Sequence, residues 1–476
     1  MTATAIAPGP KPSLLDAFSY RPGRDPLAFF TSLARTYGDI VAYRLGGERL
    51  LFVNQPQYIK DVLVTHNRNF TKGRALQRTK RLLGEGLLTS EGATHLRQRR
   101  LMQPAFHRER IAAYADTMVA YADRTRRAWR DGAPLDIAQE MNRLTLSIVG
   151  KTLFDADVES QAAEVGEALT GVMETFWTTM LPFSDLLEHL PVPKLRRARA
   201  ARAQLDAIIY GMIAERRRSH RDHGDLLSML LSAQDEEAEG AAQPSLGDAQ
   251  SSFGVAGAMS DVKVRDEAMT IFLAGHETTA NALTWTWYLL STAPDVEAKL
   301  HAEVDRVLQG RLPRVADIAS LPFVERVVTE SMRLYPPAWL IGRRAIADYE
   351  LGEYAVPART ILVMSPFVTQ RDARFYTDPE RFDPERWTPD FRATLPKFAY
   401  FPFGGGPRQC IGESFAWMEL ILLVATIAQR WRLQLVPGHP VVPEPLVTLR
   451  TKYGVRMTVH QRRLESSAVL SASPPV

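Results

Sequence analysis

Cys410 is the single cysteine among the 476 residues of this chain, and its surroundings are typical of a metal ligand. It lies in the run FGGGPRQCIG at residues 403–412, directly before an apolar stretch that is predicted to be helical. Glycines let a backbone turn tightly and approach a flat partner closely. A cysteine before a helix faces the positive end of the helix dipole, which favours the thiolate. One cysteine excludes an internal disulfide, a cysteine-based zinc site and an iron–sulfur cluster, but one thiolate is sufficient as an axial ligand of haem iron.

A lone cysteine is more often a small buried apolar residue, so the spacing of its neighbours decides between the two interpretations. Phe403, Gly406, Arg408, Cys410 and Gly412 resemble the haem-binding loop of the cytochrome P450 family, F-x-x-G-x-R-x-C-x-G. The resemblance implies haem b (iron protoporphyrin IX) as the cofactor, with the Cys410 thiolate as its axial ligand and with Phe403 and Arg408 beside it. It also implies a haem-thiolate monooxygenase, an enzyme that inserts one oxygen atom of O2 into its substrate.

A second motif, AGHETT at residues 274–279, lies midway along a helical stretch that runs over about residues 260–290. Glycine inside a helix costs about 1 kcal/mol relative to alanine, and threonine is also a poor helix former whose hydroxyl can bond back to the backbone. The motif is either a tolerated weak point in a core helix or an opening beside a ligand. It resembles the family pattern A-G-x-[DE]-T-[TS]. That resemblance implies that Glu277 and Thr278 are the catalytic acid and alcohol that supply protons for the reduction of dioxygen.

Glu330 and Arg333 have the spacing E-x-x-R, which alone predicts only a surface ion pair worth roughly 0.2–0.5 kcal/mol. The same spacing occurs by chance at Glu140/Arg143, Glu215/Arg218 and Glu303/Arg306. The Glu330/Arg333 pair differs from these in its context, because LYPP follows at residues 334–337 and FDPERW at residues 382–387. By resemblance to the family, Glu330, Arg333 and Arg386 form a buried triad with a structural role.

The two propionates of haem require cationic partners. The segment HLRQR at residues 95–99 resembles the family pattern W-x-x-x-R with a histidine in the tryptophan position, which implies that His95 and Arg99 bind propionates. Arg408 in the cysteine loop is a third candidate, and Arg343 is a fourth that could be confused with Arg344. In most proteins each of these arginines would be a solvated surface charge, so the assignment depends on their position relative to the motifs.

The substrate pocket is predicted to be apolar and to take a lipophilic small molecule. The motifs are similar to those of bacterial family members with eukaryote-like signatures, which makes a fatty acid, a terpenoid or a steroid the expected substrate class. The residues predicted to line the pocket are Ala274, Ala338, Trp339, Leu340 and Val447.

The sequence contains no GxGxxG-type dinucleotide segment and no cysteine cluster, so electrons are predicted to come from separate proteins. The expected partners are a ferredoxin or flavodoxin with its NAD(P)H-dependent reductase. A basic cluster either meets such an acidic partner or forms a solvated helix face; its members are Arg97, Arg100, Arg108 and Arg110.

Two other functions remain open at this point. One is a peroxide-driven or isomerising haem-thiolate enzyme that needs no O2, and the other is a non-catalytic haem-binding or ligand-sensing module. Neither requires an acid and an alcohol for proton delivery, so Glu277 and Thr278 argue against both.

The elements that must position these residues are mainly helical. Apolar residues at three- and four-residue spacing predict helices over residues 108–131, 138–153, 159–180, 195–220 and 293–308. Residues 39–54 predict a hairpin around Gly46-Gly47, and two further β-rich blocks span about residues 343–365 and 432–460. The predicted fold class is therefore mainly α with a minor β-sheet, and the resemblance implies the cytochrome P450 fold.

One haem domain is expected over residues 21–463, after an N-terminal extension at residues 1–20 and before a disordered tail at residues 464–476. Residues 236–259 are predicted to form a long surface loop, and the apolar segment Phe176–Pro193 is either core or a lid. Lys and Arg number 58 against 54 Asp and Glu, and a net charge of +4 is too small for a nucleic-acid-binding protein. Without a signal peptide or an apolar run of about 18 residues, no transmembrane segment and a cytoplasmic location are expected.

Overall fold

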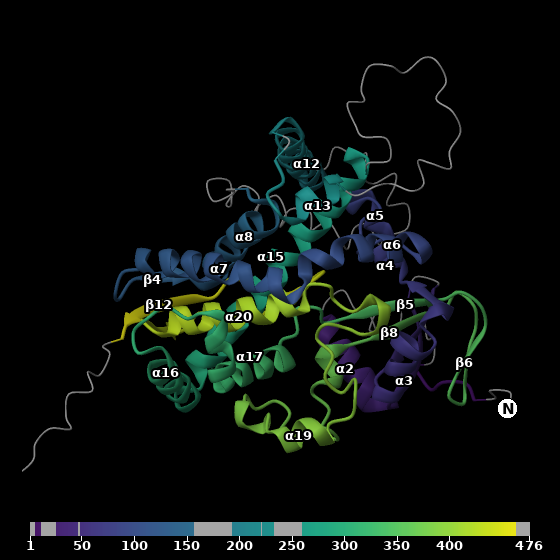
Figure 1. Ribbon diagram of the computed structural model, residues 1–476. Helices are drawn as coiled ribbons and strands as arrows, with labels where there is room; N and C mark the ends of the chain where they lie inside the picture. The colour runs from purple at the N-terminus through teal and green to yellow at the C-terminus, as the bar shows by residue number, and fades with distance from the viewer. Residues whose placement is uncertain are drawn as a thin grey trace, which may run out of the picture.

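Helices form most of the structure and lie beside a smaller β-rich part (Figure 1). A computed structural model describes residues 5–10, 25–45, 48–156, 193–219, 221–232 and 259–462. Its α-helices are α2 (Pro26–Tyr37), α3 (Pro56–Lys60), α4 (Arg74–Arg78), α5 (Lys80–Leu83), α6 (Gly92–Met102), α7 (Arg108–Ala128), α8 (Ile137–Phe154), α12 (Pro193–Ser219), α13 (Leu226–Ser232), α15 (Asp261–Thr292), α16 (Pro294–Leu308), α17 (Pro322–Leu334), α18 (Pro366–Thr369), α19 (Pro389–Thr394) and α20 (Glu413–Ala428). Short segments of other helix types are η1 (Asp61–Thr65), η2 (Asn67–Asn69), η3 (Gln103–Phe106), η5 (Val315–Ser320), η6 (Pro384–Arg386) and η7 (Gly406–Arg408).

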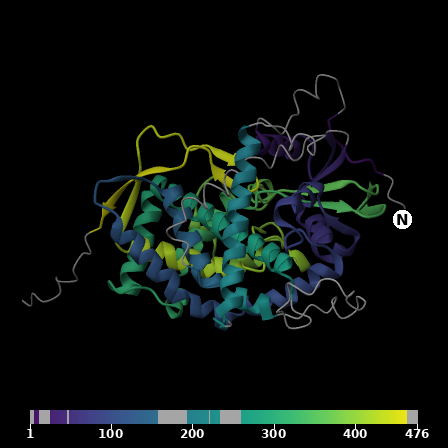
Figure 2. The same ribbon diagram turned by 90° about the horizontal axis from the view of Figure 1, so that it is seen from above.

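The helix α15 organises the helical part. It begins at Asp261 because the hydroxyl of Ser260 accepts a hydrogen bond from the N–H of Lys263 at 3.4 Å. It packs against α8, α17 and α20, and α12 crosses it, as the view from above shows (Figure 2). Most of its 32 residues are buried, which is typical of a helix at the centre of a large protein. The helices predicted at residues 108–131, 138–153, 195–220 and 293–308 are α7, α8, α12 and α16, with ends within three residues.

A five-stranded sheet forms the centre of the β-rich part, in the order β1-β2-β8-β5-β3. Only β2 and β8 pair in parallel, and the other neighbours are antiparallel. Alternate residues of β2 enter two separate apolar cores, Leu50 and Phe52 on one face and Leu51 and Val53 on the other. The strands are β1 (Ile40–Leu45), β2 (Glu48–Val53), β3 (Phe70–Lys72), β5 (Ile341–Ala345) and β8 (Ile361–Met364).

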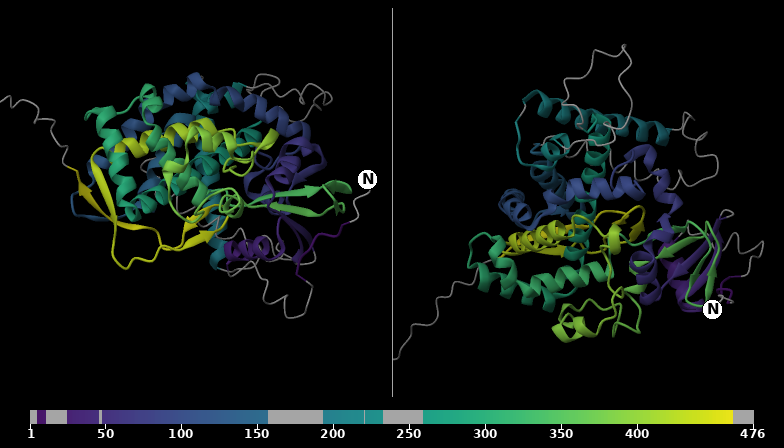
Figure 3. Two further views of the ribbon diagram at one scale, coloured as in Figure 1. Left: turned by 90° about the horizontal axis from the view of Figure 1, so that it is seen from below. Right: turned by 45° about the vertical axis from the view of Figure 1, so that its right-hand side comes forward.

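The last β-rich block does not join this sheet, which corrects the prediction of one minor sheet. Met457 and Val459 in that block face the helical core, and their strand pairs with β4 instead. The resulting sheet, β4-β12-β9, lies at the opposite end of the molecule (Figure 3). The remaining strands are β4 (Pro134–Asp136), β6 (Tyr349–Leu351), β7 (Tyr354–Val356), β9 (Trp431–Leu435), β10 (Pro443–Pro445), β11 (Leu449–Thr451) and β12 (Arg456–Gln461). The prediction of a mainly α protein with minor β structure is confirmed.

Several predictions concern residues outside the described ranges. They are most of the N-terminal extension, the turn at Gly46-Gly47, the helix at residues 159–180, the core or lid segment up to residue 192, the loop at residues 236–258 and the tail at residues 464–476. Within the described ranges, no helix has both the length and the apolar character that are needed to cross a membrane.

Candidate active site

A tight loop holds Cys410 directly before α20. The N–H of Cys410 donates to the carbonyl of Phe403 at 3.0 Å, and the N–H of Gln409 donates to that of Gly406 at 3.0 Å. Gly406 has a φ of +68°, and any side chain there would collide with the carbonyl oxygen of Leu63, so this position requires glycine. The backbone therefore closes the loop by itself and fixes the direction of the cysteine side chain.

The residue Cys410 keeps exposed surface, whereas Phe401 and Phe415 on either side of the loop are buried. Surrounding protein atoms desolvate the sulfur and raise the pKa of the thiol to about 11, whereas the N–H of Gly412 lowers it by less. The N–H of Gly412 at the start of α20 favours the thiolate, while desolvation by the surrounding protein acts against it. A metal cation at the sulfur would stabilise the charged form.

The structure brings together the four side chains that the sequence assigns to propionates, and it adds Lys72. Strands β3 and β5 place Lys72 opposite Arg343 in register. The charge of Arg408 acts on Lys72, His95 and Arg343, and the charge of Arg99 acts on His95 and Arg408. We refer to these five residues as the cation cluster.

Several basic groups of the cation cluster are desolvated and lie near one another, which disfavours their charged forms. Burial and the neighbouring Arg408 lower the pKa of Lys72 to about 6, that of His95 to about 3 and that of Arg343 to about 10. Glu91 compensates part of the charge through its ion pair with Arg408. A ligand with carboxylates would favour the charged forms of Lys72 and Arg343 and would accept hydrogen bonds from these donors. The cation cluster and the nearby thiol therefore fit a haem with two propionates.

Arg99 and Arg343 have different contacts within the cation cluster. The guanidinium of Arg99 donates to the carbonyl of Gln409 at 2.8 Å, which joins α6 to the cysteine loop. Arg343 faces the cluster, whereas Arg344, the next residue on β5, lies 4.0 Å from Glu48. The alternation of a β-strand thus separates two arginines that look alike in the sequence.

His95 and Phe403 both lie in well-packed surroundings. His95 is buried on α6. The ring of Phe403 is half-buried, and its centre lies 5.7 Å from that of Trp417 on α20.

The motif at residues 274–279 lies in an unbroken part of α15, so its glycine and threonines are accommodated within a continuous helix. The hydroxyl of Thr278 donates to the carbonyl of Ala274 at 2.7 Å, and Thr145 on α8 donates to the carbonyl of His276 at 3.0 Å. Such bonds add to the helical ladder without breaking it. Ala274 itself is exposed, although Leu273 before it is buried.

Glu277 extends from α15 toward the loop between β10 and β11. Its Oε1 accepts a hydrogen bond from the hydroxyl of Thr448 at 2.7 Å. Its Oε2 is buried and has no hydrogen-bond partner among the described residues. Burial raises the pKa of Glu277 more than Thr448 and the charge of Arg450 lower it. A buried carboxyl with one free oxygen is suited to proton transfer.

Glu330, Arg333 and Arg386 meet in one buried network. Arg333 donates twice to Glu330, at 2.8 Å and 2.8 Å, and Arg386 donates to it at 3.0 Å. Glu330 and Arg333 are both fully buried. In contrast, Arg143 in the Glu140/Arg143 pair is 54% exposed. The same sequence spacing therefore produces a core network in one place and a surface pair in the other.

Trp339 departs from its predicted place in the substrate pocket. Its side chain is 2% exposed, its indole N–H donates to the carbonyl of Leu446 at 3.0 Å, and its ring packs near Phe30. A side chain in the apolar core supports the segment but does not line a pocket. The other four predicted residues keep exposed surface: Ala274 is exposed, and Ala338, Leu340 and Val447 are partly exposed.

The predicted basic cluster spans the end of α6 and the start of α7. Arg100 and Arg108 are exposed, Arg97 is partly buried, and Arg110 donates to the carbonyl of Gly224.

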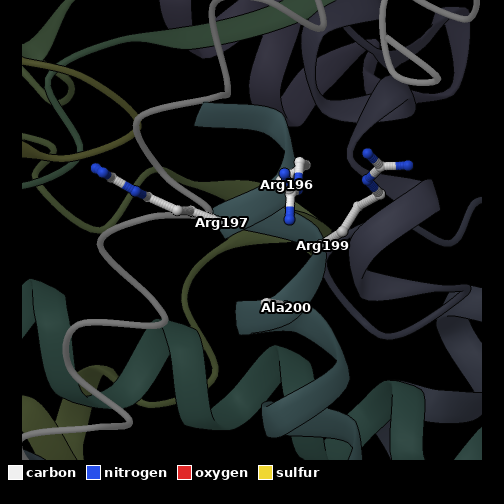
Figure 4. Close-up of a pocket in the computed structure, with 4 residues that line it drawn as sticks. All are labelled: Arg196, Arg197, Arg199 and Ala200. Carbon is white, nitrogen blue, oxygen red and sulfur yellow. The ribbon is translucent and has the colours of Figure 1, made fainter. Parts of the chain in front are cut away.

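A hollow of about 570 Å³ lies at the start of α12 and is lined by Arg196, Arg197, Arg199 and Ala200 (Figure 4). The guanidinium groups of Arg197 and Arg199 point to opposite sides, so the three arginines do not converge on one ligand. Cationic walls do not suit a lipophilic substrate, and we do not assign the substrate to this hollow.

Two site residues cannot be recognised from the sequence. Lys72 is one of 58 Lys and Arg residues, and only its pairing with β5 reveals its place. Thr448 lies 171 positions from Glu277, and no local pattern marks it.

Comparison with known proteins agrees with this geometry. The family model "Cytochrome P450" matches residues 7–457. The chain is 40% identical to cyclooctatin synthase of Streptomyces melanosporofaciens, over 93% of this chain and 93% of that protein. It is also 40% identical to cyclooctat-9-en-7-ol 5-monooxygenase of the same organism, over 91% of this chain and 90% of that protein. It is 35% identical to pentalenene oxygenase of Streptomyces avermitilis, over 96% of this chain and 97% of that protein.

Solved structures show the same fold. Retinoic acid-bound cyanobacterial CYP120A1 superposes with a TM-score of 0.82 at 24% identity, over 96% of this chain and 99% of that chain. The cytochrome P450DA heme domain superposes with a TM-score of 0.80 at 26% identity, over 97% and 98%. The sequence motifs, the fold and the relatives together show that this chain belongs to the cytochrome P450 family and is a P450 monooxygenase.

Proposed function

We propose that this protein is a haem-thiolate monooxygenase that hydroxylates a cyclic terpenoid, with Cys410 as the axial ligand of haem b. The observation that carries the proposal is the cation cluster beside the only thiol of the chain. Bound haem supplies the activation of dioxygen, while the chain contributes binding, orientation and proton movement.

In this proposal the cation cluster holds the propionates. Lys72, His95 and Arg343 are each less basic than usual because they lie in poorly solvated surroundings near Arg408. Two carboxylates would relieve that repulsion and gain charge-assisted hydrogen bonds. Glu277 and Thr278, which are adjacent on α15, are proposed to deliver protons. Glu277 supplies a buried carboxyl with one free oxygen, and Thr278 supplies a hydroxyl at a partly exposed position.

Arg343→Leu tests the place of the cation cluster. We expect the variant to lose haem about tenfold faster than the wild type, because a poorly solvated charged partner of the propionates is removed. The rate is measured as transfer of haem to an excess of apomyoglobin. Arg344→Leu is the matched control, since it removes the adjacent arginine that lies near Glu48. Equal rates in the two variants would show that Arg343 does not hold a propionate.

The substrate class follows from the relatives and from the pocket residues. Two relatives are named for cyclooctatin and cyclooctat-9-en-7-ol, and a third is named for pentalenene. These names favour a terpenoid over the fatty acid and steroid alternatives. Three of the predicted pocket residues, the exposed Ala274 and the partly exposed Leu340 and Val447, have apolar side chains, as such a substrate requires.

Electrons are proposed to come from a ferredoxin or flavodoxin and its NAD(P)H-dependent reductase. Arg100 and Arg108 are exposed near the end of α6, and the neighbouring Arg99 bonds to the cysteine loop. An acidic redox protein would therefore find positive charge close to the ligand loop.

A ligand panel tests the proposed substrate class. We expect cyclic terpene hydrocarbons and alcohols to shift the ferric Soret band, and at least one of them to be hydroxylated with surrogate ferredoxin, reductase and NAD(P)H. The reason is that an apolar pocket binds an apolar polycyclic molecule by excluding water from both surfaces. Mass spectrometry with isotopically labelled dioxygen should place one labelled oxygen atom in the product.

Other ligands and an alternative oxidant in the same panel distinguish the terpenoid monooxygenase from the alternative substrates and from a peroxide-driven enzyme. Fatty acids and steroids serve as comparison ligands for the terpenoid assignment. Product formation with hydrogen peroxide but not with dioxygen and reductant would instead support a peroxide-driven enzyme. If no terpenoid shifts the Soret band, the substrate assignment is wrong even though the family is shown.

A further inference from the structure

The loop between β10 and β11 is fastened to one face of α15. Glu277, Asn281 and Trp285 are four residues apart, so their side chains lie on the same side of the helix. The amide of Asn281 donates to the hydroxyl of Thr448 at 3.1 Å, and the indole of Trp285 donates to the carbonyl of Leu449 at 2.9 Å. The acid predicted from the AGHETT motif is therefore part of a contact between distant segments.

The hydrogen bonds in this contact have a fixed direction. A threonine hydroxyl carries one proton, and the hydroxyl of Thr448 already accepts a hydrogen bond from Asn281. Its own proton is then directed to Oε1 of Glu277, at 2.7 Å. Asn281 and Thr448 are 4% and 6% exposed, so water competes little with these bonds.

The hairpin does not need the Thr448 hydroxyl in order to stay in place. Two other hydrogen bonds fix the next residue, Leu449. Its carbonyl accepts from the indole of Trp285, and its N–H donates to the carbonyl of Pro337 at 2.9 Å. Trp285 is itself fixed by stacking on Tyr335, with ring centres 3.9 Å apart. The hydroxyl of Thr448 is therefore available to act on the carboxyl of Glu277.

We propose that Thr448 is a positioning residue that, oriented by Asn281, holds one oxygen of the Glu277 carboxyl and leaves the other oxygen free to pass a proton. The free atom is Oε2, which is buried and has no partner among the described residues. This inference rests on the proposed role of Glu277 as the proton-delivering acid, and it adds a residue that the AGHETT motif does not contain.

Infrared titration of the resting haem protein tests this inference without a substrate. The carboxyl band of Glu277 is identified by its absence from Glu277→Gln. In Thr448→Val, which keeps the shape of the side chain but removes the hydroxyl, we expect this band to move. We also expect the acid dissociation constant of Glu277 to fall about tenfold, because a hydrogen bond to the charged form is lost. Thr448→Ser should restore both properties, and Asn281→Leu should give an intermediate value.

The matched control is Thr286→Val on the same helix. Thr286 is fully buried, and its hydroxyl donates to the carbonyl of Ala282 at 2.7 Å, away from Glu277. A wild-type titration of Glu277 in Thr448→Val, or an equal shift in Thr286→Val, would overturn the inference. If Thr448→Val does not fold, Asn281→Leu tests the inference instead. A wild-type titration of Glu277 in that variant would also overturn the inference.

The proposed function and this inference fail in different ways. If Glu277→Gln forms product with wild-type efficiency, the proposed role of the acid is wrong, whatever the infrared bands show. If Glu277→Gln diverts electrons to hydrogen peroxide while Thr448→Val titrates like the wild type, only the positioning role is wrong.

Discussion

Replacing Cys410 by alanine is expected to remove the thiolate-type Soret band of the reduced carbon-monoxide complex and to lower hydroxylation by at least about a thousandfold. The chain contains no second cysteine that could take over as a ligand. The backbone contacts of the loop do not need the sulfur, because the N–H of Cys410 still reaches Phe403 and Arg99 still reaches Gln409. The variant should therefore fold and bind haem through the cation cluster while it lacks the thiolate.

Difference spectroscopy and haem content are measured on the same preparation, so that loss of the ligand is separated from loss of the cofactor. Ser414→Ala is the control, since it shortens an exposed side chain four residues further on in α20. A thiolate-type band that persists in Cys410→Ala would refute the ligand assignment. Loss of haem without any other spectral change would show that the thiolate is needed for retention as well.

Replacing Glu330 by alanine is expected to destabilise the protein by about 3–5 kcal/mol, the typical cost of leaving a buried partner charge uncompensated. Glu330 and Arg333 are fully buried, so water cannot replace the lost carboxylate. Glu330 also accepts hydrogen bonds from Arg386, from the indole of Trp387 at 2.8 Å and from the N–H of Asp383 at 3.0 Å. All of these donors lose their acceptor in the variant.

Denaturant unfolding of the haem protein, followed by circular dichroism, measures this effect. Glu215→Ala is the matched control, because Glu215 has the same E-x-x-R spacing but is exposed. Its unfolding midpoint should equal that of the wild type. If Glu330→Ala unfolds at the same denaturant concentration as Glu215→Ala, the network does not stabilise the fold.

The parts of the site that depend on local chain geometry could be predicted. The cysteine loop, the AGHETT motif within a long helix and the helices predicted at residues 108–131, 138–153, 195–220 and 293–308 follow from patterns within a few turns. The structure contains these elements at the predicted positions. Strand alternation predicts that Arg343 and Arg344 point to opposite faces, but only the structure shows that Arg343 is the one that faces the cation cluster.

The parts that depend on packing between distant segments could not be predicted. Lys72 joins the cation cluster only because β3 pairs with β5, and Trp339 enters the core only because Phe30 and Leu446 lie against it. The pKa of Cys410 could not be predicted either, since the helix dipole is visible in the sequence and the desolvation by distant residues is not.

The single sulfhydryl also gives this protein a built-in chemical label. A thiol-directed reagent can modify one sulfhydryl in the whole chain, that of Cys410, a residue that keeps exposed surface. A thiolate that is bound to iron is not free to react as a nucleophile. If Cys410 ligates iron as proposed, the fraction of molecules that a maleimide dye labels when the reaction is complete would report the chains whose Cys410 is not bound to iron.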